Sequence, residues 1–95
     1  MLDELIDRHG AGAVVTAHPV ILESGVTYRW EILIDGERVS GVSVHAHGVR
    51  DRPNEMVLLM VSGGNEIEIA RWSKERPEPA RIVRTLGDLR RVRQA

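Results

Sequence analysis

The stretch Val26–His47, VTYRWEILIDGERVSGVSVHAH, holds two runs of alternating residues on either side of Asp35-Gly36. In the first run aromatic and branched apolar residues recur at every second position, and in the second run small apolar residues alternate with serine and histidine. Alternation with a period of two is typical of a β-strand that buries one face. We therefore predict a β-hairpin that turns at Asp35-Gly36 and forms the centre of an antiparallel sheet.

The turn at Asp35-Gly36 decides which side chains of the predicted hairpin face each other. A tight two-residue turn would set Trp30 opposite Gly41 and would mix polar and apolar residues on both faces. A three-residue loop with a left-handed Gly36 shifts the pairing by one residue and sets Tyr28 opposite a valine. Because a one-residue slip moves every side chain to the other face, the hydrophobic pattern favours the bulged, three-residue turn.

The chain has three aromatic residues, two of them in the predicted hairpin. Tyr28 and Trp30 share the apolar face of their strand, which predicts that both lie in the core. The alternative is that they are exposed anchors of a sheet face that binds another protein. Trp72 alternates with Glu66 and Glu68, which predicts a partly exposed residue at an interface.

The segments before the hairpin predict one helix and one strand. Apolar residues recur at helical spacing from Leu2, acidic residues load the first turns, and Gly10 ends the run, as in a short amphipathic helix. Residues 13–23 are apolar and β-branched with Pro19 among them, and proline lacks the N–H that a sheet needs. They are therefore expected to form an edge or bulged strand, joined to the hairpin through a turn at Ser24-Gly25.

The segments after the hairpin predict a loop and two more strands. Residues 48–55 form a polar loop around Pro53, with two cations and two acids that can pair within the loop. Met56–Val61 is apolar on both faces, so it should be covered on both sides, by helices, a second sheet or another copy of the protein. This pattern makes a homodimer plausible. Residues 67–73 alternate again and form the next strand.

The C-terminal segment predicts a short strand and a closing helix. Prolines break the sheet in residues 74–79, and residues 81–84 resume a strand. Thr85 and Asp88 have the spacing of a capping box, and leucines follow on one face of the predicted helix with Val92. The expected fold is therefore α+β: an antiparallel meander of four to five strands with a short helix at each end.

This ending resembles the C-termini of small accessory proteins carried by plasmids and other mobile elements. The resemblance covers about twenty residues and rests on the following positions: Pro79, Arg81, Arg84, Thr85, Leu86, Asp88 and Leu89. The aromatic residue that usually precedes the threonine is absent here, and Val83 stands nearest to its place. The resemblance implies a mobile-element accessory protein and assigns no functional residue.

Length and composition limit the function classes. Ninety-five residues are expected to form a single α+β domain, residues 1–95, and 42% hydrophobic residues are ordinary for a globular protein. The chain has no cysteine, which excludes disulfides, zinc-thiolate sites and thiol catalysis. The longest apolar run is too short to span a membrane and the N-terminus is acidic, so we predict a cytoplasmic protein without membrane contact.

Histidines and loop carboxylates could carry chemistry in principle. His45 and His47 lie on one strand face, about 7 Å apart at their Cα atoms by the rise of a strand, but no further ligand stands at a suitable spacing. His18 is expected near Glu31, far from that pair. His47 could act with loop carboxylates in acid–base catalysis, or the loop could simply be solvated. We therefore predict no catalytic residue, no metal site and no cofactor.

Charge is distributed unevenly along the chain. Residues 1–70 carry a balance of −6 and residues 71–95 a balance of +5. Arginine suits phosphate oxygens, so an arginine-rich C-terminal helix could bind nucleic acid, or it could pack near the acidic body and neutralise it. The arginines concerned are Arg81, Arg84, Arg90, Arg91 and Arg93.

The favoured hypothesis is a small non-catalytic protein-binding module, an accessory or inhibitor-type protein that acts through a protein partner. The alternative is a nucleic-acid-associated protein that uses the C-terminal arginines, and a third hypothesis is a metal-assisted enzyme at His45 and His47. The predicted binding residues are Arg50, Asp51, Arg52, Trp72, Arg84, Arg90, Arg91 and Arg93.

Overall fold

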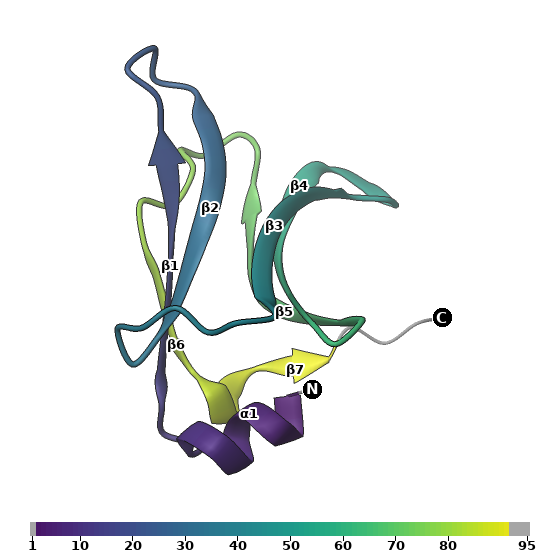
Figure 1. Cartoon of the computed structure of the whole chain (residues 1–95). Coiled ribbons are helices and arrows are strands. Elements are labelled where there is room, and N and C mark those ends of the chain that lie inside the picture. Colours follow the sequence, from purple (N-terminus) through teal and green to yellow (C-terminus); the bar gives the residue numbers. More distant parts are fainter. Residues whose placement is uncertain (1, 92–95) are drawn as a thin grey trace.

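The computed structural model describes residues 2–91, with side chains through Leu89, and consists mostly of antiparallel β-structure. One sheet has three strands in the order β2-β1-β6, and the other has four in the order β3-β4-β5-β7. Figure 1 shows the two sheets facing each other, with the helix across one end. The elements are α1 (Leu2–His9), β1 (Val14–Ile21), β2 (Thr27–Ile34), β3 (Val42–Val49), β4 (Arg52–Ser62), β5 (Asn65–Ser73), β6 (Ile82–Thr85), the 3-10 turn η1 (Leu86–Asp88) and β7 (Arg90–Arg91).

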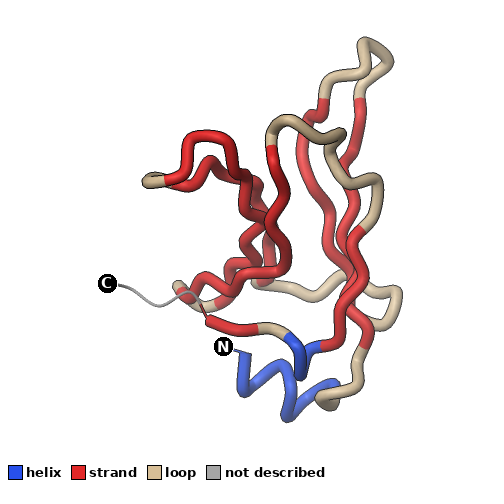
Figure 2. The backbone as a smooth tube through the Cα atoms, turned by 180° about the vertical axis from the view of Figure 1, so that it is seen from behind, coloured by secondary structure: helices blue, strands red, loops and turns tan. Residues whose placement is uncertain are grey.

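The predicted single meander is therefore wrong, because the described residues form six strands and a two-residue seventh, divided between two sheets. The general α+β character with antiparallel pairing is confirmed. The core lies between the sheets and draws on both of them, and its fully buried side chains come from β1, β4, β5 and η1. Figure 2 shows the connections between the sheets from behind.

The predicted N-terminal helix is confirmed as α1. Leu2 and Leu5 are buried against the sheets, and acidic residues occupy the first turn, where they oppose the positive end of the helix dipole. The N–H of Gly10 donates to the carbonyl of Ile6 over 2.7 Å, and Gly10 has a φ of 90°. A left-handed glycine therefore ends the helix, as the sequence indicated.

The predicted pairing of β2 with β3 is wrong. Ile34 and Glu37 exchange both backbone hydrogen bonds, at 2.9 and 3.0 Å, around Asp35 and Gly36, whose φ angles are 49° and 79°. The left-handed Gly36 is confirmed, but the turn is the tight two-residue form with both residues left-handed. The chain then leaves β2 after this single bridge and crosses to the other sheet.

β2 forms its backbone hydrogen bonds with β1, on one edge only. The turn at Gly25, whose φ is 87°, folds β1 and β2 into a local hairpin in which Ala17 faces Ile32 and His18 faces Glu31. β1 is central over the stretch that also pairs with β6, but Pro19 lies beyond that stretch, where β1 has only one neighbour. A register shift follows between Val20 and Ile21, but its extra residue is Tyr28 of β2, so the one-sided pairing expected of a proline is present and the bulge lies in the partner strand.

The expected polar loop at residues 48–55 is mostly strand. β3 continues to Val49 and β4 begins at Arg52, so only Arg50 and Asp51 form the turn. The expected ion pair inside this segment is present between Arg52 and Glu55, at 3.7 Å. The charged residues around Pro53 have the composition of a loop, but the structure accommodates the proline in an irregular part of the β3–β4 register.

The strand that is apolar on both faces, within β4, is covered without a second copy. Leu58 and Met60 are fully buried in the core between the sheets. Val57 and Leu59 point the other way and are 7% and 8% exposed. Their partners on the neighbouring strands are polar and long: His47 and Arg71 flank Val57, and His45 and Glu68 flank Leu59. The apolar parts of such side chains can cover a valine or leucine.

A β-bulge in β5 changes the face on which Trp72 lies. Leu58 pairs with Ala70 but Leu59 pairs with Glu68, so Ile69 is an extra residue in β5. One extra residue reverses the alternation of everything that follows it in the strand.

Trp72 therefore turns to the core side, away from the face that the sequence predicted. It is half-buried and packed on the core, and its ring centroid lies 5.7 Å from that of Trp30 with the planes tilted by 37°. This geometry is favourable for an aromatic pair.

The predicted C-terminal helix is wrong in its type. After β6 the chain makes only the 3-10 turn η1 and then enters β7. The N–H groups of Leu86 and Gly87 donate to the carbonyls of Ala13 and Ala11, at 3.0 and 2.9 Å. A glycine at the second position disfavours an α-helix, and the backbone of Arg90 and Arg91 pairs with β5 instead of continuing one. Leu86 and Leu89 are nonetheless buried, as expected of the apolar face.

Thr85 and Asp88, the residues of the expected capping box, make a hydrogen bond between their side chains only. The Thr85 hydroxyl donates to the Asp88 carboxylate over 2.7 Å and makes no bond to the backbone of η1. Val92, expected on the same face, lies outside the described residues.

Candidate functional site

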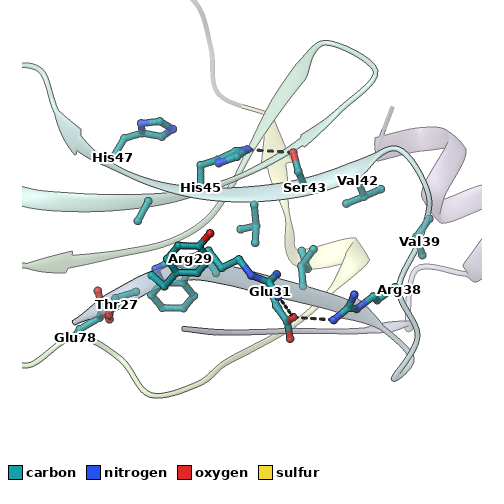
Figure 3. A pocket seen from close by; sticks show the side chains of 15 residues that line it. Thr27, Arg29, Glu31, Arg38, Val39, Val42, Ser43, His45, His47 and Glu78 are labelled. Atoms are coloured by element: carbon teal, nitrogen blue, oxygen red, sulfur yellow. Dashed lines mark hydrogen bonds and ion pairs between the residues drawn. The ribbon is translucent and has the colours of Figure 1, made fainter. Parts of the chain in front are cut away.

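A groove of about 680 Å³ runs between β2 and β3 and is the candidate functional site (Figure 3). Residues from both strands, from the segment that joins them and from the loop before β6 line it. The lining residues are Thr27, Tyr28, Arg29, Trp30, Glu31, Ile32, Arg38, Val39, Val42, Ser43, Val44, His45, Ala46, His47 and Glu78.

The groove is lined by the edges of two strands. Each strand contributes six consecutive residues, 27–32 from β2 and 42–47 from β3. Successive side chains of a strand point to opposite faces, so a continuous run can line a space only where the strand turns its edge toward it. β2 is the outer strand of one sheet and β3 the outer strand of the other, which places two edges across the groove from each other.

The inner part of the groove is apolar and contains an exposed aromatic ring. Trp30 is 7% exposed, as expected for the core, but Tyr28 is 68% exposed, which matches the alternative considered for it. The two differ in register, because Val20 pairs with Arg29 and Ile21 with Thr27, so Tyr28 is the extra residue of a bulge in β2. Ile32, Val44 and other branched residues line the rest.

The indole N–H of Trp30 has no hydrogen-bond partner in the described structure, although it is buried. A buried donor without an acceptor costs about 1–3 kcal/mol of desolvation. Most buried tryptophan N–H groups find an acceptor. This unsatisfied donor lies beneath the surface of the groove, because the indole nitrogen is buried although Trp30 is a lining residue.

The wall formed by β2 carries an ion-pair cluster centred on Glu31. Its carboxylate lies 2.8 Å from Arg29, 2.7 Å from Arg38 and 3.1 Å from His18. The predicted proximity of His18 to Glu31 is thus confirmed. Burial alone would raise the pKa of Glu31, but the charges of Arg38 and Arg29, with their hydrogen bonds and that of His18, lower it below its usual value.

Positive charge exceeds negative charge in this cluster, because two guanidinium groups share one carboxylate. Arg29 and Arg38 are respectively 51% and 74% exposed, whereas Glu31 is only 18% exposed. The arginines therefore present free hydrogen-bonding capacity to solvent beside the groove.

The wall formed by β3 carries the two histidines that the sequence singled out. His45 lies 3.2 Å from the Ser43 hydroxyl, and the rings of His45 and His47 are 6.1 Å apart. Among residues 2–91 no three His, Asp or Glu side chains gather closely enough to hold a metal ion. At the other end of the groove the Thr27 hydroxyl donates to Glu78 over 2.5 Å.

None of the predicted binding residues with a described side chain lines the groove. Arg50 and Asp51 are exposed in the β3–β4 turn, and Arg52 begins β4 beside them. Trp72 packs behind the groove, against Trp30. Arg84 donates to the backbone carbonyls of Ile69 and Val83, at 3.2 and 2.9 Å, and so links β6 to β5.

The remaining predicted arginines lie at the end of the chain. The backbone of Arg90 pairs with Glu68 and that of Arg91 with Ile67, which forms β7. Arg93 lies outside the described residues. The arginine-bearing helix on which the nucleic-acid alternative rested is absent from the described part of the chain.

Sequence reasoning missed Arg29, Arg38 and Tyr28 as members of one site. Arg29 and Glu31 alternate with the apolar residues of β2, which signals only a polar face. Arg38 lies in a segment without a periodic pattern. No signal in the sequence shows that β2 and β3 are the outer strands of two different sheets. Their positions depend on which strands pair with β1 and β4.

No family model, curated protein or solved structure matched the chain in the comparisons. The helices of the described residues include none that is long and apolar enough to cross a membrane.

Proposed function

We propose that this protein is a small non-catalytic binding module that holds a segment of a partner protein in the groove between β2 and β3. The observation that carries the proposal is the pair of facing strand edges along the groove. Strand edges present backbone donors and acceptors at regular spacing, and polypeptide is the ligand whose own backbone repeats at that spacing.

The residue types that line the groove are also common in protein-binding surfaces. Tyrosine, tryptophan and arginine are the residues that most often dominate binding energy at protein interfaces. Tyr28, Arg29 and Arg38 are exposed at the groove, and Trp30 lies beneath them. An apolar interior with a charged rim is the usual organisation of such an interface.

A display selection with random linear peptides tests the proposal. The wild-type protein should enrich peptides that bind to it in solution, and Tyr28→Ser should weaken them by about tenfold or more, as expected for an aromatic anchor. Val83→Ser is the matched control, because Val83 is 47% exposed on β6, at the opposite edge of the three-stranded sheet. Failure to enrich any peptide, or equal loss in both variants, would contradict the proposal.

A further inference from the structure

The edge of β3 that faces the groove is free over most of its length. β3 pairs with β4 on one side only, and within residues 2–91 no backbone hydrogen bond outside the ladders involves residues 43–49. The backbone edge of β2 is engaged at one end by the bridge from Ile34 to Glu37, and at the other end the side chains of Thr27 and Glu78 meet beside it. A strand edge without a partner is a template for another strand.

The charges beside this edge indicate what the incoming strand would carry. The guanidinium groups of Arg29 and Arg38 exceed the single carboxylate that they share, so a second carboxylate would be complementary.

We propose, resting on the protein-binding function above, that the occupant is an extended segment of another protein that adds to the edge of β3 as an antiparallel or parallel strand. One of its side chains is a carboxylate that binds Arg29 and Arg38, and an apolar side chain packs on Tyr28. The added strand lies between β3 and β2 and partly closes the gap between the two sheets. This is recognition by strand addition, in which the backbone provides affinity and alternate side chains provide specificity.

Backbone methylation of the ligand tests the strand pairing without any risk to the fold of the protein. The probe is the tightest linear peptide from the display selection, synthesised as a series with one N-methylated amide at a time. A paired strand directs every second N–H to its neighbour, so affinity should fall about tenfold or more at alternate positions and remain nearly unchanged between them. Losses without this alternation would overturn strand addition, while the protein-binding function would still stand.

Charge exchange tests the carboxylate. Arg38→Glu should weaken the selected peptide by about tenfold, and replacement of the peptide's acidic residue by lysine should restore binding to that variant. Arg81→Glu is the charge-matched control, because Arg81 is exposed beside β6, on the far edge of the three-stranded sheet. A selected peptide without an acidic residue, or equal effects of the two variants, would overturn this part of the proposal.

The self-association of the protein distinguishes a second copy from a heterologous partner. Sedimentation across a range of concentrations should show a monomer whose groove binds the peptide. A dimer that the selected peptide dissociates would mean that β3 pairs with β3 of another copy, and it would overturn the proposal of a different protein as the occupant.

Discussion

The packing of Trp72 on Trp30 makes Trp72→Ala a quantitative test of the bulge in β5. Removal of a fully buried tryptophan costs about 3–5 kcal/mol. Trp72 is half-buried, and its substitution also removes the contact with Trp30, whose ring is 5.7 Å away. We therefore expect the free energy of unfolding to fall by about 2 kcal/mol. Without the bulge Trp72 would lie on the outer face with Glu66 and Glu68, where a substitution changes stability by less than about 0.5 kcal/mol.

Urea unfolding followed by circular dichroism at the backbone wavelengths measures this difference. For a domain of this size the midpoint should fall by about 1–2 M urea. Arg71→Ala is the control: Arg71 precedes Trp72 and is 45% exposed, with ion pairs to Glu68 and Glu55. Its loss should cost at most about 1 kcal/mol. Equal, small effects of the two substitutions would refute the inward orientation of Trp72 and with it the position of the bulge.

Three further outcomes are expected from the same structure. Leu58→Ala should lower the free energy of unfolding by about 2–5 kcal/mol in urea titration, because Leu58 is fully buried between the sheets; a cost below about 1 kcal/mol would place it outside the core. Gly36→Ala should lower it by about 1–2 kcal/mol, because the φ of Gly36 is 79°; an unchanged thermal midpoint would argue against the left-handed conformation of Gly36. The pKa of Glu31 is lowered in the folded state, so its stabilisation is present above the unfolded pKa and disappears as the pH falls through the folded pKa. Wild type should therefore exceed Glu31→Gln in stability at neutral pH and lose that advantage in acid, and a gap that widened in acid would contradict this sign.

Local features of the fold could be predicted from the sequence because they depend on nearby residues. The spacing of Leu2 and Leu5 with Gly10 behind them was sufficient for α1. Alternation was sufficient to identify β2 and β3, and a left-handed Gly36 followed from the Asp-Gly pair. Each of these signals is contained within one turn or one strand.

The pairing of strands could not be predicted in the same way. Alternation shows which face of a strand is buried, but it does not show which strand lies at its edge. β2 and β3 bury complementary faces, which suits a hairpin and suits two facing sheets equally well. Pairing with β1 does not settle this choice, because it leaves the second edge of β2 open.

The site was less predictable than the fold, because it consists of strand edges that have no partner strand and of side chains that the core does not bury. The bulge at Ile69 turns Trp72 inward and removes it from the surface. Tyr28 is the extra residue of a bulge in β2, and its side chain is 68% exposed. Both outcomes depend on the register of neighbouring strands, and that register carries no local sequence signal.

The pairing of β1 with β6 also bears on how the chain matures during synthesis. Val14 pairs with Thr85, so β1 gains its second neighbour only after the strands between them in the chain have been synthesised. The β1–β2 hairpin and the β3–β4–β5 meander involve only contacts between neighbours in the chain, and such contacts form early. A nascent chain that stops before Ile82 should therefore contain both of these units but lack β6 and η1, and the apolar residues that β6 and η1 cover would be exposed to chaperones.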